Sequence, residues 1–213
     1  MTVISAVFFD FGGVILSSPF EAFERYERRI GIDVGTIRSI NASNPDDNAW
    51  ARLERGETDV ATFVGEFETE ASALGIELDG TEVIGCLQGE VRPEMITALA
   101  KCRKHFATAL LTNNFVSGNP EWASGGTFGE ILGYFDAVIE SSVVGCRKPE
   151  PDFYRVALER VGVSPDQVVF LDDLGINLRP AREMGMTTIK VCDPFEAIAE
   201  LERVTGISIL SPD

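Results

Sequence analysis

The chain has 213 residues, of which 45% are hydrophobic and 24% are charged, and its 34 acidic and 18 basic residues give a formal charge of −16. So acidic a chain repels nucleic acid and anionic membranes, so we expect neither as a partner. No segment approaches the roughly 18 apolar residues that cross a bilayer, and the first residues lack the basic and apolar regions of a signal peptide, so we expect a cytoplasmic protein.

The first predicted strand ends at a carboxylate. An apolar run over residues 3–9 stops at Asp10, and two glycines, Gly12 and Gly13, follow closely. Such a run predicts a strand buried on both faces, as in parallel sheets. Open α/β sheets place their chemistry at the carboxyl ends of their strands. The same residues also suit a plain turn capped by Asp10, and this stretch alone leaves both interpretations open.

Residues 17–90 have a helical pattern. Short helices are predicted over residues 20–30, 50–56 and 83–87, with a break at Asn44-Pro45-Asp46. Between them, apolar residues from Val60 to Leu74 recur at helical spacing until Gly75. These helices could simply cover one face of a sheet, but the segment is longer than such a connection needs. We therefore predict a four-helix cap domain at residues 17–90.

From residue 91 onward, strands and helices alternate. Helices are predicted to begin at Pro93 and Pro151, to end at Gly185, and to follow Asp193-Pro194. Residues 114–134 predict an irregular connection, because glycine and proline recur there. The expected fold is a doubly wound parallel sheet, a Rossmann-like core of residues 1–16 and 91–213 that carries the cap. Further strands are predicted at residues 106–111, 135–140, 168–171 and 187–191.

Polar side chains follow several of the predicted strands. In a parallel sheet the carboxyl ends of all strands lie at one edge, so these side chains are expected to meet. Carboxylates with a backbone carbonyl suit Mg²⁺, a lysine can neutralise carboxylate and phosphate oxygens, and a threonine can bind phosphate. Taken singly, each is compatible with an ordinary surface turn. The residues are Asp10, Thr112, Asn113, Lys148, Asp172 and Asp173.

Three segments, in this order, resemble the haloacid dehalogenase (HAD) superfamily of aspartyl-phosphate-forming hydrolases. Within it, the chain is similar to the N-terminal phosphatase domain of soluble epoxide hydrolase and to the related domain of multidomain acyl-CoA dehydrogenases. The resemblance extends over the whole chain and is weakest across the cap. The segments are FDFGGV, LLTNNF and GCRKPEPDFYRVALERVGVSPDQVVFLDDLGINLRPAREMGMTTIKV.

The resemblance implies a role for each matching residue. Asp10 matches the nucleophile that forms an aspartyl phosphate, and Lys148 matches the lysine that holds nucleophile and phosphate together. The implied cofactor is Mg²⁺ and the implied partner is a small phosphorylated substrate. The remaining matches are Thr112 with Asn113 for phosphate, Asp10, Asp173 and the Gly12 carbonyl for the metal, and Asp172 with Asn177 in supporting positions.

One position departs from the family pattern. The family's phosphatases usually carry a second aspartate two residues after the nucleophile, and this chain has Gly12 there. That aspartate protonates the leaving alcohol, and loss of a general acid–base costs about 10²–10⁴ in rate. We therefore expect a leaving group that needs little protonation, such as an acyl phosphate or a sugar 1-phosphate, or a substrate that supplies its own acid.

Three functions are compatible with this sequence. The favoured one is a Mg²⁺-dependent phosphatase with an altered acid–base. The second is a dehalogenase-type C–X hydrolase or a C–P-cleaving enzyme, because these enzymes also lack the second aspartate. Dehalogenases dispense with the metal that Asp172 and Asp173 suggest, and C–P cleavage needs a cap lysine, which residues 17–90 do not contain. The third is a non-catalytic binding or regulatory domain that keeps the fold.

Cysteine, histidine and aromatic residues add three expectations. Cys86, Cys102, Cys146 and Cys192 are scattered without a CxxC pair, which predicts free thiols rather than a zinc site or disulfide framework. With His105 as the only histidine, catalysis by a Cys–His or Ser–His pair is poorly supported. Specificity should come from the cap, where Trp50, Phe63 and Phe67 are the first candidates, although the two phenylalanines also suit the cap's own core.

Overall fold

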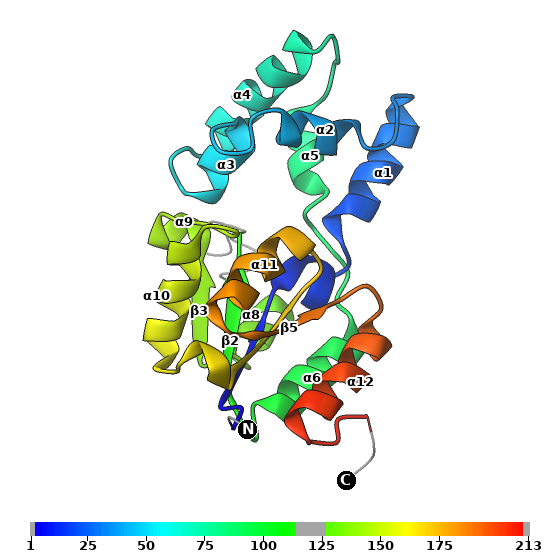
Figure 1. Cartoon of the computed structure of the whole chain (residues 1–213). Helices are drawn as coiled ribbons and strands as arrows, with labels where there is room; N and C mark the ends of the chain where they lie inside the picture. Colours follow the sequence, from blue (N-terminus) through cyan, green and yellow to red (C-terminus); the bar gives the residue numbers. More distant parts are fainter. Residues whose placement is uncertain (1–2, 114–126, 211–213) are drawn as a thin grey trace.

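The computed structural model describes residues 3–113 and 127–210 of the chain. At its centre is a sheet of five parallel strands in the order β3-β2-β1-β4-β5, so the chain winds outward on both sides of β1 (Figure 1). This order confirms the predicted doubly wound α/β fold. The strands are β1 (Ala6–Phe9), β2 (Ala107–Thr112), β3 (Ala137–Glu140), β4 (Val168–Asp172) and β5 (Thr187–Lys190).

The central position of β1 explains its continuous apolar sequence. Its residues alternate between two hydrophobic clusters, one on each face of the sheet, and all four are fully buried. In register, Phe9 pairs with Leu110 of β2 on one side and with Leu171 of β4 on the other. The carboxyl ends of these three parallel strands therefore lie at the same edge of the sheet, where chemistry was predicted.

Helices cover both faces of the sheet. The cluster on one face includes buried residues of α6 and α12, and the cluster on the other includes those of α10 and α11. Their ends follow the predicted signals: α10 begins with Pro151, α11 ends before Gly185, and Asp193 caps α12. The bounds are α6 (Pro93–Cys102), α10 (Pro151–Val161), α11 (Gly175–Met184) and α12 (Pro194–Thr205).

Two short helices of the core were not predicted. Within the expected irregular connection at 114–134, residues 114–126 lie outside the described ranges, but Thr127–Leu132 forms α8. Phe128 packs edge-on against Phe11 and Ile131 joins the core cluster, so tertiary contacts stabilise a helix that its sequence signals only weakly. The single turn α9 (Ser141–Val144) follows β3 directly.

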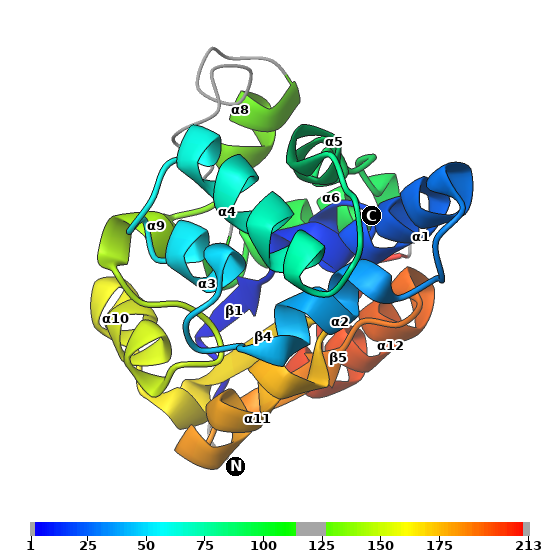
Figure 2. The same cartoon turned by 90° about the horizontal axis from the view of Figure 1, so that it is seen from above.

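Residues 19–85 form a separate helical layer above the carboxyl edge of the sheet (Figures 1 and 2). Their buried apolar residues form a third hydrophobic cluster, separate from the two that flank the sheet. The division of the chain into cap and core domains at 17–90 stays a prediction. The helices are α1 (Pro19–Ile30), α2 (Thr36–Ser43), α3 (Ala49–Glu54), α4 (Val60–Ala73) and α5 (Gly80–Gly85).

The expectation of four helices in this layer was wrong, because the structure has five. The additional helix, α2, has the sequence TIRSINAS, which is mostly polar, and no side chain caps its start. Its buried residues are Ile37 and Ile40, which join the third cluster. Two apolar residues give too weak a periodicity to predict a helix, and burial against the neighbouring helices supplies the stability.

The helical layer joins the core through two adjacent chain segments. Leu16 and Val91 form an isolated antiparallel bridge, and the Ser17 N–H donates to the Glu90 carbonyl at 2.7 Å. A Cβ atom at Gly89 would lie 2.9 Å from both Leu16 Cβ and the Ser17 carbonyl oxygen. A glycine at position 89 therefore allows the outgoing and returning segments to approach closely.

The three aromatic candidates for specificity lie together inside the helical layer. Phe63 and Phe67 are fully buried and stack at 5.4 Å between ring centroids. Trp50 packs edge-on against Phe63 at 5.1 Å and is partly exposed. Both phenylalanines therefore belong to the core of this layer, and Trp50 is the one that also reaches the layer's surface.

Within residues 3–113 and 127–210, no helix combines the length and the apolar character that crossing a bilayer demands.

Candidate active site

Asp10 lies immediately beyond β1 and caps the turn that follows. Its Oδ1 accepts a hydrogen bond from the Phe11 N–H at 2.7 Å, which fixes the carboxylate over the Phe11–Ile15 turn. Gly13 adopts a positive φ of 79° in this turn, and a Cβ atom there would lie 2.2 Å from Asp173 Oδ2. Asp10 thus caps a turn, and the same turn brings Asp10 and Asp173 to one place, so both interpretations of this stretch stay open.

Lys148 lies between two carboxylates. Its Nζ is 2.7 Å from Asp10 Oδ1 and 2.8 Å from Asp172 Oδ2, and the lysine is only 2% exposed. Burial disfavours the charge on Lys148, but Asp10 and Asp172 outweigh it, so the pKa of the lysine is raised and the side chain stays positive. The predicted convergence of Lys148 with the strand ends of β1 and β4 is therefore present.

Asp172 is held from several directions. Asn177 Nδ2 lies 3.1 Å from each of its carboxylate oxygens, and the Leu174 N–H donates to Oδ1 at 2.8 Å. Tyr154 in turn donates its hydroxyl to the Asn177 carbonyl at 2.6 Å. Asp172 is thereby fixed as the partner of Lys148, which fits the supporting positions expected for Asp172 and Asn177.

Asp10, Asp172 and Asp173 form a carboxylate cluster. One oxygen of each lies within 4.8 Å of the others. Burial, followed by repulsion from Asp172, raises the pKa of Asp173 to about 6, and burial likewise raises the pKa of Asp10 well above its usual value. Three ionised carboxylates would carry three negative charges, and Lys148 offsets only one of them. A divalent cation that prefers oxygen ligands would therefore stabilise the cluster. The donor set therefore fits Mg²⁺.

Thr112 is the last residue of β2, and Asn113 follows it at the same edge of the sheet. Thr112 is 1% exposed. The Asn113 side chain pairs with the main chain of Lys148: the Lys148 N–H donates to Asn113 Oδ1 at 2.8 Å, and Asn113 Nδ2 donates to the Lys148 carbonyl at 2.9 Å. Asn113 thus supports Lys148 directly. Phosphate binding by Thr112 and Asn113, and metal binding by the Gly12 carbonyl, stay predictions.

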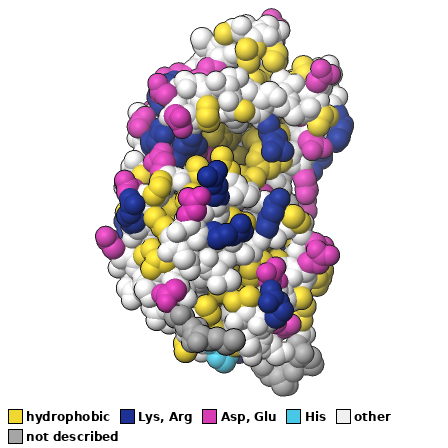
Figure 3. Space-filling view, viewed as in Figure 1, with side chains coloured by type: hydrophobic (Ala, Val, Ile, Leu, Met, Phe, Trp, Pro, Cys, Tyr) yellow, Lys and Arg dark blue, Asp and Glu magenta, His cyan; other side chains and the backbone are white. Residues whose placement is uncertain are grey.

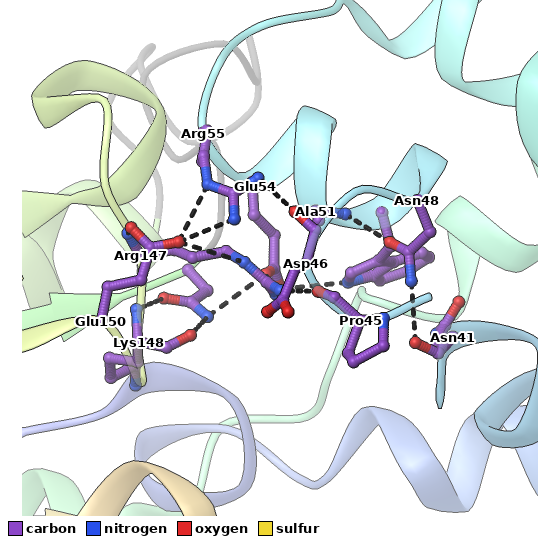
Figure 4. A network of polar contacts seen from close by, with 12 residues as sticks. Asn41, Pro45, Asp46, Asn48, Ala51, Glu54, Arg55, Arg147, Lys148 and Glu150 are labelled. Carbon is purple, nitrogen blue, oxygen red and sulfur yellow. Dashed lines mark hydrogen bonds and ion pairs between the residues drawn. The ribbon is translucent and has the colours of Figure 1, made fainter. Parts of the chain in front are cut away.

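Three charged residues around the site were not predicted from the sequence. Arg92 donates to the Gly13 carbonyl at 2.6 Å. Glu54 at the end of α3 and Arg147 beside Lys148 form an ion pair at 2.5 Å, which brings α3 against the loop that carries Lys148 (Figure 4). The position of Arg147 next to Lys148 was a usable signal. Nothing in the sequence singles out Glu54.

The thiols and the histidine take no part in this cluster. All four cysteines are free, as expected. Cys146 lies two residues from Lys148, but burial and then Glu150 and Asp152 raise the pKa of its thiol, which keeps it protonated. His105 precedes β2 and so lies at the opposite, amino-terminal edge of the sheet.

Figure 3 shows the surface hollowed between the α1–α5 layer and the core, with hydrophobic side chains inside the hollow.

Comparison with known proteins gives a consistent result. The family model described as haloacid dehalogenase-like hydrolase matches residues 4–185. The chain is 32% identical to bifunctional epoxide hydrolase 2 of Sus scrofa over 97% of this chain and 40% of that protein. It is 34% identical to acyl-CoA dehydrogenase family member 10 of Mus musculus over 96% of this chain and 19% of that protein. The chain thus spans less than half the length of these two relatives.

Among solved structures, a HAD family enzyme of Bacteroides thetaiotaomicron superimposes with a TM-score of 0.60 at 23% identity. The match covers 88% of this chain and 93% of that one. That protein was solved in complex with magnesium and inorganic phosphate. At this level of identity the likeness concerns the fold.

Proposed function

Because this chain belongs to the haloacid dehalogenase-like hydrolases, we propose that it is a Mg²⁺-dependent phosphatase that acts on small phosphorylated molecules through an aspartyl phosphate on Asp10. The observation that carries this proposal is the position of Lys148 Nζ, 2.7 Å from Asp10 and 2.8 Å from Asp172 at the carboxyl edge of the sheet. A lysine held there can bind a phosphoryl oxygen while it keeps the nucleophile oriented.

The reaction divides into two displacements at phosphorus. Asp10 Oδ1 is held by Lys148 and by the Phe11 N–H, so we assign the attack to Oδ2. The Oδ2–P bond forms while the bond from phosphorus to the leaving oxygen breaks, and that oxygen keeps the electron pair. Water then attacks the phosphorus of the aspartyl phosphate, which releases inorganic phosphate and restores the Asp10 carboxylate.

The surrounding residues divide the remaining work. Thr112 would donate its hydroxyl to a phosphoryl oxygen, and Asp172 with Asn177 keeps Lys148 oriented. Asp10, Asp173 and the Gly12 carbonyl would hold Mg²⁺, whose charge offsets the negative charge of carboxylate and phosphoryl oxygens. Residues 17–90 would act as the cap domain that covers the site and excludes water.

Gly12 sets the leaving group. With no carboxylate at this position, the departing oxygen takes its proton from water or from the substrate. Acyl phosphates and sugar 1-phosphates, whose leaving oxygens need little protonation, are therefore the substrate classes we propose. The backbone at Gly12 has an ordinary extended conformation with φ −69° and ψ 130°, so an aspartate there is conformationally allowed.

The test is phosphate release from a panel of acyl, sugar 1-, aryl and alkyl phosphates, with and without MgCl₂. Asp10→Asn is the control, and it should abolish a Mg²⁺-dependent turnover of the wild type. A plot of log kcat/KM against leaving-group pKa should fall more steeply for the wild type than for Gly12→Asp. Equal slopes would refute the assigned effect of Gly12, and Asp10→Asn with wild-type turnover would refute the aspartyl phosphate.

The second candidate is a non-catalytic binding or regulatory domain, and Gly12 is the observation that favours it. It predicts no turnover of any phosphate ester, together with binding of Mg²⁺ and inorganic phosphate at the carboxylate cluster. Halide release from 2-haloacids, measured in the same experiment, would instead identify a dehalogenase-type hydrolase.

A further inference from the structure

The loop that carries Lys148 is held by contacts from the helical layer as well as by the core. Two hydrogen bonds join the Asn113 carboxamide to the Lys148 main chain, and the same Asn113 Nδ2 lies 3.3 Å from Glu54 Oε2. Glu54 is the last residue of α3. A carboxylate of the helical layer therefore contacts the side chain that fixes the main chain of Lys148.

Glu54 is surrounded by hydrogen-bond donors. Its Oε1 accepts from Trp50 Nε1 at 3.0 Å, and its Oε2 accepts from Arg147 Nη1 at 2.5 Å and from Asn113. The side chain is only 13% exposed. Burial raises the pKa of Glu54, whereas Arg147 and the other donors favour the ionised form. Trp50, Arg147 and Asn113 all donate to it, so Glu54 serves as a hydrogen-bond acceptor at this junction.

A second ion pair of opposite polarity lies next to the first. Arg55, which follows α3, is 2.8 Å from Glu150 of the Lys148 loop, and it also donates to the Asp46 carbonyl. Arg147 donates to the Pro45 carbonyl in addition to Glu54. The charges thus alternate across the junction, with acid on α3 facing base on the loop and the reverse beside it (Figure 4). This pattern defines one seated position of α3 against the loop.

We propose that Glu54 is a positioning residue of the phosphatase reaction, an inference that rests on the proposed function. Through Arg147 and Asn113 it holds the loop in the position that places Lys148 Nζ between Asp10 and Asp172. The lysine is then correctly placed only while α3 is seated on the core, so seating of the helical layer and assembly of the phosphate site are one event. A partner contact that orients a catalytic group is worth about 10-fold to 100-fold in activity.

The experiment compares Glu54→Gln with Glu66→Gln. Glu66 pairs with Arg52 at 3.1 Å, and both residues lie within the helical layer, so its substitution removes a similar ion pair that does not reach the Lys148 loop. Glu54→Gln keeps the size of the side chain but turns an NH₂ group toward the donors. The two readouts are hydrogen–deuterium exchange at the Lys148 amide, which bonds to Asn113 Oδ1, and kcat/KM for the phosphate ester that the wild type hydrolyses.

Glu54→Gln should speed exchange at the Lys148 amide about 10-fold and lower kcat/KM about 10-fold to 100-fold. Glu66→Gln should stay within about 2-fold of wild type in both. Wild-type exchange and wild-type kcat/KM in Glu54→Gln would overturn the proposal. Should Glu54→Gln fail to fold, Arg147→Lys and Arg147→Met replace it: the lysine variant should retain more activity and slower exchange, and equal losses would refute the positioning role.

The exchange measurement separates this inference from the proposed function. If the wild type hydrolyses no phosphate ester, the proposed function fails, but faster exchange in Glu54→Gln alone would still show that Glu54 holds the Lys148 loop. If the wild type is active and Glu54→Gln changes neither readout, the positioning role fails and the phosphatase stands.

Discussion

Gly13 and Gly12 are adjacent, yet the structure predicts opposite effects of adding a methyl group to each. At Gly13, φ is 79° and the new Cβ would lie 2.2 Å from Asp173 Oδ2. At Gly12 the backbone is in an ordinary extended conformation, and the nearest atom to a new Cβ is Pro19 Cδ at 3.5 Å. Gly13→Ala therefore displaces a proposed metal ligand, and Gly12→Ala is its matched control.

The expected magnitude follows from this geometry. A left-handed conformation costs an L-residue roughly 1–2 kcal/mol. The Asp173 oxygen must also move about 1.2 Å, from 2.2 Å to the 3.4 Å where ordinary van der Waals contact begins. We expect Gly13→Ala to lower the free energy of unfolding by about 2 kcal/mol, which corresponds to a fall of about 4–8 °C in Tm for a chain of this length. Gly12→Ala should stay within about 1 kcal/mol of wild type and can even be stabilising.

The assay is thermal unfolding in EDTA and in MgCl₂. A metal at about 100 times its dissociation constant stabilises a folded protein by about 2.7 kcal/mol. We therefore expect Mg²⁺ to raise the Tm of wild type and of Gly12→Ala by about 5–11 °C, and to have little effect on Gly13→Ala. A full Mg²⁺ response in Gly13→Ala would show that Asp173 is not a ligand, and the assignment of the metal site would have to be withdrawn.

Three further predictions concern the same site. Asp173→Asn should stabilise the protein in EDTA at pH 7.5 by up to about 3 kcal/mol, because it removes a carboxylate whose pKa is raised from 3.8 to about 6. The same substitution should abolish the rise in Tm with Mg²⁺, and unchanged unfolding curves would contradict the prediction. Gly12→Asp should raise kcat/KM for alkyl phosphates by about 10²-fold and for acyl phosphates much less, as measured by phosphate release; equal gains would argue against a general-acid effect. Asn177→Ala should lower Tm and kcat together, because Asp172 loses its hydrogen bonds to Asn177. The free energy of unfolding, measured with denaturant, should fall by about 1–3 kcal/mol. Wild-type values of Tm and kcat would show that Asn177 does not support Lys148.

The local sequence was sufficient to predict most strands and helices of the core. β1 was predictable because a central parallel strand is buried on both faces and therefore reads as a continuous apolar run. α10 and α12 were predictable because Pro151 and Asp193 start them with recognisable chemistry. α2 and α8 were not, because their few apolar residues give little periodicity and packing against other elements supplies their stability.

Contacts between residues far apart in the sequence could be identified only from the tertiary structure. The sequence by itself identified Asp10, Lys148 and Asp173 as candidates, since each follows a strand or lies in a recognisable motif and all parallel strands end at one edge. Only the tertiary structure shows that Lys148 lies between Asp10 and Asp172, and that Glu54 contacts Arg147 and Asn113. Partners so far apart along the chain share no local pattern, because their contact depends on how the helical layer packs against the sheet.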